Sequence, residues 1–164
     1  MSIRQVEVQR FSLVSSKSME AVMIRLEAAV GHPDMSVFRH DVAAATASAE
    51  LEIVIGAAVG TSGLMEFTRF DIGAILRMYQ GERAQRSLRL VVGNPVIMKQ
   101  MVEHVPDAAS YAPVTVLIDE RSDGVHVSYD RMASFLAPYG NPAALKVAQD
   151  LDAKIESLLA EACT

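Results

Sequence analysis

The chain has 164 residues, of which 51% are hydrophobic and 21% are charged, with a formal net charge of −5 and one cysteine. This length suits one domain over residues 1–164, which buries roughly 70% of its unfolded surface and needs no cross-link to hold its core. The acidic balance argues against a nucleic-acid partner, since phosphate binding needs clustered Lys and Arg, and the single cysteine excludes an intrachain disulfide.

The first third of the chain predicts a strand followed by a helix. Residues 4–14 alternate loosely between polar and apolar side chains, which indicates a strand. The serines just before residue 19 can cap a helix over 19–30, which Gly31 and Pro33 end. Residues 34–48 show no clear helical or strand period in their apolar residues, although residues 36–40 are a candidate strand.

The middle of the chain contains one ambiguous segment. Residues 50–59 fit a helix by their apolar spacing and a strand by the β-branched run at 53–55. We prefer a helix, because Ser48 can cap it and Gly60 can end it. The pattern then predicts a strand over 64–70, a turn or short helix over 71–79 and a strand over 84–92.

The segment that follows has the clearest helix-start and turn signals of the chain. Asn94 is a good N-cap and Pro95 fits the first helical position, so a helix begins there. The nearly unbroken aliphatic run at 114–118 predicts a strand that is largely covered. Asp123-Gly124 is typical of a tight hairpin turn, which folds a strand over 125–129 back antiparallel.

The C-terminal segment predicts a long amphipathic helix. Asn141-Pro142 repeats the earlier Asn-Pro helix start. The order of elements predicts an α+β fold, a two-layer sandwich with a mixed or largely antiparallel sheet and helices packed on one face. The apolar stripe is long for one small sheet, so we expect a homodimer with this helix or an edge strand at the interface. The stripe comprises Leu145, Ala148, Leu151, Ile155, Leu158 and Leu159.

Several short segments together resemble a known family, the uncharacterised prokaryotic family called domain of unknown function 302. The resemblance implies a fold and no activity. Many members carry Pro-Cys-Arg where this chain has Pro113-Val114-Thr115, so a function that needs that thiol or cation does not transfer. The similar segments are Phe11-Ser12, 59–64, Phe70-Asp71, Gly93-Asn94-Pro95, Tyr111-Ala112-Pro113 and 127–130.

Three motif-like patterns fall short of a functional motif. The glycine-rich segment 56–63 resembles a dinucleotide loop, but a strand pattern follows it, so close packing and a helix end are preferred. Arg83, Arg86 and Arg89 are interpreted as a solvated strand face rather than a phosphate site. The four histidines lack the three- or four-residue spacing of helical metal ligands. We therefore predict no cofactor, metal or catalytic residue.

Two strand segments place aromatic residues beside charged ones, as ligand pockets do. Alternation along a strand puts Phe67, Arg69 and Asp71 on one face and Tyr129 with Arg131 on another. If the two faces coincide, the two arginines favour an anionic ligand. The candidate ligand-binding residues are Phe67, Arg69, Asp71, Met98, Tyr111, Tyr129 and Arg131.

Three functional hypotheses remain open. The preferred one is a dimeric, non-enzymatic module that binds a small, largely apolar molecule between sheet and helices. The second is an enzyme in which Asp71 or Asp130 is the base and Tyr111 or Tyr129 the proton donor. The third is a purely structural or protein-interaction role. Because the sequence has no signal-peptide core and no apolar run of ~20 residues, we expect a cytoplasmic protein without a membrane partner.

Overall fold

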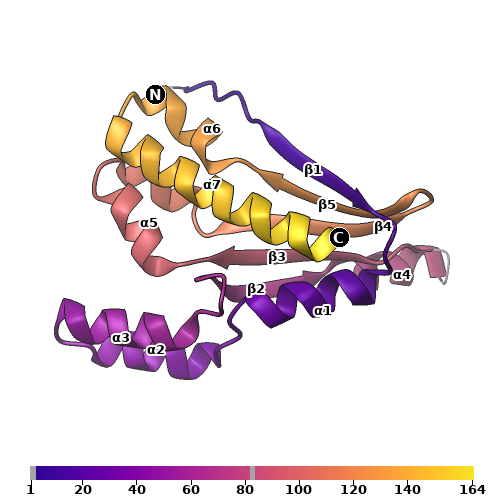
Figure 1. Ribbon diagram of the computed structural model, residues 1–164, viewed down its shortest axis with the longest axis horizontal. Coiled ribbons are helices and arrows are strands. Elements are labelled where there is room, and N and C mark those ends of the chain that lie inside the picture. Colours follow the sequence, from indigo (N-terminus) through magenta and orange to yellow (C-terminus); the bar gives the residue numbers. More distant parts are fainter. Residues whose placement is uncertain (1–2, 82–83) are drawn as a thin grey trace.

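The computed structural model describes residues 3–81 and 84–164 (Figure 1). Five strands form one open sheet in the order β1-β5-β4-β3-β2, and every neighbouring pair is antiparallel. The predicted α+β class and the largely antiparallel sheet are confirmed. The strands are β1 (Arg10–Ser15), β2 (Met65–Asp71), β3 (Ser87–Gly93), β4 (Val114–Arg121) and β5 (Gly124–Asp130).

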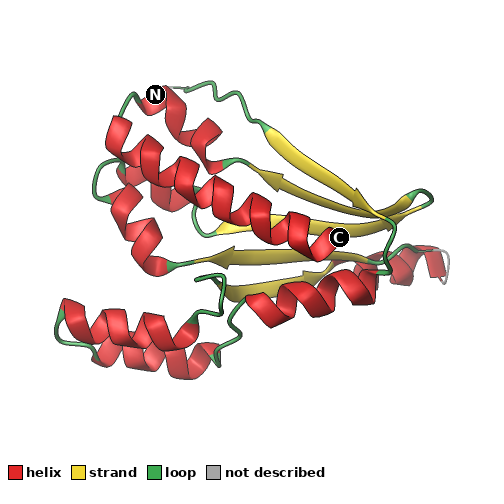
Figure 2. Ribbon diagram, in the orientation of Figure 1, coloured by secondary structure: helices red, strands yellow, loops and turns green. Residues whose placement is uncertain are grey.

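Helices α1 and α7 lie across one face of the sheet, as Figure 2 shows, and between them bury the main hydrophobic core. Helices α2 and α3 form a hairpin beside this body, and α4 follows β2 (Figure 1). The helices are α1 (Met19–Ala29), α2 (Met35–Ala44), α3 (Ser48–Ala58), α4 (Ile72–Gln80), α5 (Pro95–Val102), α6 (Met132–Leu136) and α7 (Pro142–Cys163), with short 3₁₀ helices η2 (Pro106–Ser110) and η3 (Ala137–Tyr139).

The two faces of the sheet differ in burial. The burial pattern alternates along β5 and along β4 as far as Asp119, with Val116 and Val127 buried under the helices and Leu117 and Ser128 partly exposed on the other side. We call that other side the open face. The strand register places on it the side chains of Arg10, Ser12, Val14, Phe70, Arg89, Thr115, Leu117, Ser128 and Asp130.

Side-chain caps fix three of the predicted helix starts. Ser18 accepts from the backbone N–H of Ala21, at 3.2 Å, at the start of α1. Asn94 and Asn141 accept in the same way at the starts of α5 and α7. Gly124, at φ 139°, follows Asp123 in the predicted hairpin between β4 and β5. Each of these predictions rests on a local hydrogen bond or backbone preference, and each is confirmed.

Two elements differ from expectation. The candidate strand over 36–40 is wrong, because this segment lies in α2. Asp34 caps that helix by accepting from the N–H groups of Ser36 and Val37, and Phe38 packs in a small cluster with Ile55 of α3. The short helix α6 was not predicted, since its five residues are too few for a helical periodicity to appear. The segment for which a helix is preferred is α3, which ends at Ala58, so the helix is confirmed. The predicted cap is wrong: Ser48 is the first helical residue, and the N-cap position is held by Ala47, which has no side-chain group to accept a capping bond.

The α2–α3 hairpin joins the body where two chain segments cross at Gly31 and Gly60. Both backbone N–H groups donate to the carbonyl oxygen of Leu64, at 2.8 and 2.9 Å. A Cβ atom on Gly31 would lie 2.0 Å from the carbonyl oxygen of Ala58, and one on Gly60 would lie 2.3 Å from that of Ala29. Gly60, which belongs to the glycine-rich segment 56–63, thus permits the close approach of the two backbones.

The apolar stripe of α7 is covered within the chain. Leu151, Ile155 and Leu159 are buried in the main core, where α7 packs against α1, α5, α6 and β1. The stripe therefore does not require a second copy to cover it, and homodimerisation stays a prediction that needs another surface. Within residues 3–81 and 84–164, every helix is too short or too polar to traverse a lipid bilayer.

Candidate functional site

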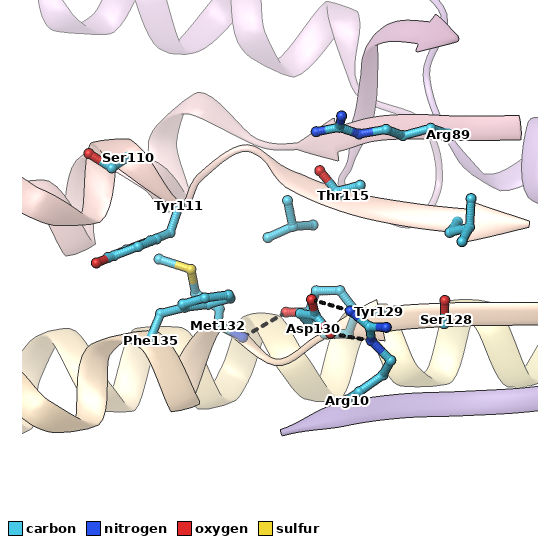
Figure 3. A pocket seen from close by; sticks show the side chains of 12 residues that line it. Arg10, Arg89, Ser110, Tyr111, Thr115, Ser128, Tyr129, Asp130, Met132 and Phe135 are labelled. Carbon is cyan, nitrogen blue, oxygen red and sulfur yellow. Dashed lines mark hydrogen bonds and ion pairs between the residues drawn. The ribbon is translucent and has the colours of Figure 1, made fainter. Parts of the chain in front are cut away.

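A cavity of about 410 Å³ lies over one end of the open face (Figure 3). Its floor is formed by β4 and β5, its sides by Arg10 of β1 and Arg89 of β3, and one end by the segments around η2 and α6. Pockets of roughly 300–1,000 Å³ are typical of small-molecule sites. The lining residues are Arg10, Arg89, Ser110, Tyr111, Val114, Thr115, Leu117, Ser128, Tyr129, Asp130, Met132 and Phe135.

Two arginines flank the cavity from opposite sides (Figure 3). Arg10 makes a two-pronged ion pair with Asp130, at 2.6 and 2.8 Å, and this hydrogen bonding raises the pKa of Arg10. The guanidinium of Arg89 lies 5.8 Å from the ring centroid of Phe70, and no carboxylate of the described residues lies within 4 Å of it. Among the described lining groups, two cations thus face one carboxylate, which leaves the cavity cationic in an acidic protein.

Aromatic rings close one end of the cavity. Tyr111 and Phe135 are stacked, with ring centroids 4.8 Å apart and an interplanar angle of 13°. The Tyr111 hydroxyl lies 3.2 Å from that of Tyr139, which donates to Asp107 at 2.8 Å. The hydrogen bond with Tyr111 is the main cause that raises the pKa of Tyr139. This hydrogen-bonded chain holds Tyr111 in place and presents an apolar ring surface to the cavity.

Beneath the cavity, a fully buried carboxylate ties three elements together. Asp152 of α7 accepts from the Tyr129 hydroxyl of β5 and from the backbone N–H groups of Met132, at 2.7 Å, and Ala133, at 3.0 Å. Asp152 is 0% exposed. It therefore caps α6 and fixes the helix that carries Phe135. Asp152 is not among the predicted site residues, although a charged residue beside the apolar stripe of α7 is a signal that could have marked it.

Tyr129 makes the fold sensitive to alkaline pH. Burial, and then the hydrogen bond to Asp152, raises its pKa above the usual value of 10.0. Below pH 10 the tyrosine is neutral in both the folded and the unfolded chain, and above it only the unfolded chain ionises. We expect the free energy of unfolding to fall by up to about 1.4 kcal/mol per pH unit there. Urea titrations should show a shallower alkaline slope for Tyr129→Phe, and equal slopes would contradict this role.

The seven predicted ligand residues do not form one pocket. Tyr111 and Tyr129 border the open-face cavity, but the Tyr129 hydroxyl is engaged by Asp152. Phe67 and Met98 meet in a separate cleft beside Asn94 that has only about 10 Å³ of free volume. A register shift between Glu66 and Thr68 interrupts the alternation of β2 at Phe67.

The predicted charged residues are engaged elsewhere. Arg69 pairs with Glu66 and Glu27, at 2.8 and 2.7 Å, and these hydrogen bonds raise its pKa. Arg131 pairs with Glu156 at 2.8 Å and lines another surface cavity. Arg69 and Arg131 thus do not share a cavity. Asp71 caps α4 by accepting from Ala74, at 2.7 Å, and pairs with Arg77.

The space between sheet and helices is nearly filled. The crevice there, bordered by Arg69 and by apolar residues of α1, β3, β4 and α7, has about 10 Å³ of free volume, room for roughly one water molecule at most. A ligand in that layer would require the helices to separate from the sheet. The open-face cavity, by contrast, has free space and combines aromatic and cationic groups.

The acid–base groups are divided by the sheet. Asp130 faces the open side, whereas the Tyr129 hydroxyl lies under the helices, so these two cannot act as a pair. Asp71 lies outside the cavity. Of the three proposed groups that border it, Tyr129 has its hydroxyl engaged by Asp152, which leaves Tyr111 and Asp130. In residues 3–81 and 84–164, no three His, Cys, Asp or Glu side chains cluster as metal ligands would. Arg83 lies outside the described residues, and Arg86 pairs with Glu20 and Glu120.

Comparison with known proteins identifies the family. Among solved structures, the chain is similar to one described as "Crystal structure of uncharacterized conserved protein DUF302 from Bacillus stearothermophilus". The TM-score is 0.65 and the sequence identity is 12%, and the match covers 94% of this chain and 98% of that chain. At this identity the likeness shows the fold alone. No curated protein matches the chain. Residues 49–162, more than half of the chain, match the family described as "Domain of unknown function DUF302". The chain therefore belongs to the DUF302 family.

Proposed function

We propose that this protein is a binding module that holds a small anionic molecule with an apolar body in the open-face cavity. The observation that carries the proposal is the combination of an arginine without a carboxylate partner among the described residues, Arg89, with the stacked Tyr111–Phe135 pair in one cavity. A cationic end favours carboxylate or phosphate groups, and an aromatic end favours a ring or alkyl chain. A cytoplasmic location belongs to the same proposal.

The polar groups of the floor fit such a ligand. Thr115 lies beside Arg89, and Ser128 lies on the far side of the arginines from the aromatic end (Figure 3); both bring hydroxyl groups to the cavity. A hydroxyl can donate to a ligand oxygen or accept from a ligand N–H, so these two fix orientation without adding charge. Leu117 supplies apolar floor beside them. The set is typical of binding sites, in which apolar lining is combined with a few oriented polar groups.

Replacing Arg89 with Ala should abolish most ligand retention and leave the fold intact. Arg89 is exposed and makes no ion pair with the described residues, so its loss removes a charge-assisted contact to the ligand and, within the chain, only the long contact with the exposed Phe70 ring. We expect about 10- to 100-fold weaker binding. The measurement is native mass spectrometry of freshly purified protein, which for the unaltered chain should show a mass above that of the denatured chain.

The matched control is Arg39→Ala. Arg39 is an exposed arginine of α2, outside the open-face cavity, so its loss changes the net charge equally. Equal loss of the retained mass in both variants would indicate a general charge effect and contradict the proposed site. A clean apo mass for the unaltered protein, together with no thermal shift across a panel of organic anions, would contradict the binding function itself.

A further inference from the structure

The outer edge of β1 carries a regular set of unused backbone hydrogen-bonding groups. Within the described residues, β1 is the end strand of the sheet and pairs with β5 alone. The Arg131 N–H donates to the Gln9 carbonyl oxygen at 2.9 Å, so the Gln9–Arg131 pair is hydrogen-bonded. Because bonded pairs alternate along an antiparallel ladder, Phe11 and Leu13 bond to β5. The backbone groups of Arg10, Ser12 and Val14 therefore point outward.

The two edges of the sheet differ in how they resist further pairing. The other edge strand, β2, has a register shift between Glu66 and Thr68, a device that disrupts regular pairing. β1 has a continuous register over all six residues and contains no proline. Its edge is therefore the one that accepts another strand without rearrangement.

The sequence of β1 is self-complementary about Ser12. When two copies run antiparallel across a two-fold axis at Ser12, Phe11 of each copy lies opposite Leu13 of the other, under the helices. Both residues are only partly buried in one copy, at the border of its main core. On the open face, the stem of Arg10 lies opposite Val14, which is 54% exposed. No like charges face each other in this register.

Charge complementarity continues beyond the strand. Glu7 is exposed in the segment before β1, and Lys17 lies in the bend just after it, so the same two-fold arrangement puts Glu7 of one copy and Lys17 of the other at the same end of the interface. Each dimer has two such pairs. Registers shifted by two residues lose either the Phe11–Leu13 pairs or one end of the ladder. We propose that two copies of this chain associate through their β1 edges, centred on Ser12, to form a continuous ten-stranded antiparallel sheet. The edge of β1 can pair whether or not the cavity holds a ligand.

The test is sedimentation velocity of the full chain over a concentration series. A six-residue strand pair is a small interface, so we expect a dimer with a dissociation constant on the order of micromolar. Ser12→Pro removes the outward N–H and leaves the bonds to β5 intact, so it should weaken the dimer at least about tenfold with little change in melting temperature. Ser12→Ala keeps the N–H and should dimerise like the unaltered chain.

Charge-reversal variants at Glu7 and Lys17 test the proposed dimer independently of Ser12. Glu7→Lys and Lys17→Glu should each weaken the dimer, and the double variant should restore it. Val14→Lys places a cation opposite Arg10 of the second copy and should also weaken association, which keeps the test decisive if Ser12→Pro fails to fold. A monomer for the unaltered chain across micromolar concentrations would overturn the proposal. So would a dimer that Ser12→Pro and Val14→Lys leave unchanged, since the contact would then lie elsewhere.

Discussion

Asp152→Ala is expected to cost about 3–5 kcal/mol of the free energy of unfolding, a large share of the stability of a domain this size. The substitution removes the acceptor for the Tyr129 hydroxyl and for the backbone N–H groups of Met132 and Ala133. The Tyr129 hydroxyl and the Met132 N–H are buried, so water cannot replace their lost acceptor without opening the core. Urea unfolding of the purified variant at neutral pH measures the loss.

The adjacent acidic residue on the same helix supplies the control. Asp150 pairs with Lys146 at the surface of α7, and its side chain is 65% exposed. Asp150→Ala removes the same charge two residues away and should change the stability by less than about 0.5 kcal/mol. Similar losses for the two variants would show that the Asp152 network does not hold α6 to the sheet.

Gly31→Ala is the second substitution with a large expected effect. The new methyl group would lie 2.0 Å from the Ala58 carbonyl oxygen and 2.7 Å from the Gly60 nitrogen, both backbone atoms that no side-chain rotation can move. The two crossing segments must separate and lose their shared hydrogen bonds to Leu64. We expect a loss of at least about 3 kcal/mol, measured as the shift of the urea midpoint.

Gly56→Ala is the matched control for this prediction. Gly56 lies in α3, and a Cβ atom there meets nothing within 4 Å. Alanine has the higher helix propensity, so this variant should gain about 0.5–1 kcal/mol. Opposite signs for the two Gly→Ala changes are expected. A Gly31→Ala protein as stable as the unaltered one would contradict the close crossing at the base of the α2–α3 hairpin.

Features with local causes could be predicted from the sequence. The capping side chains of Ser18, Asn94 and Asn141 bond to N–H groups two or three residues away, and Asp123-Gly124 fixes its own turn. The wrong strand over 36–40 has an instructive cause. Asp34 is an N-cap as strong as the others, but no long apolar stripe follows it because α2 buries Phe38 alone. A capping residue that is not followed by an apolar stripe is a weak sequence signal for a helix.

The candidate site could not be predicted in the same way, because its parts meet only in three dimensions. Arg10 and Asp130 are 120 residues apart in the sequence, and their pairing depends on the β1–β5 register. Sequence analysis favoured arginines next to aromatic residues, yet Arg69 is engaged by carboxylates of α1 and β2. Arg89 was interpreted as part of a solvated strand face, a reading that its position on the open face fits. What distinguishes it is the cavity that it borders.

The most direct test of the proposed binding site is an NMR titration of the isotope-labelled protein with benzoate, with benzamide as the uncharged control. Benzoate combines a ring for the Tyr111–Phe135 end with a carboxylate for Arg89 and should bind with roughly millimolar affinity, as expected for so small a molecule. We predict that benzoate shifts the amide signals of Thr115, Leu117 and Ser128, that benzamide shifts them much less, and that Arg89→Ala removes the difference. Equal shifts with both compounds, or benzoate shifts confined to α1 and α7, would contradict an anion site on the open face.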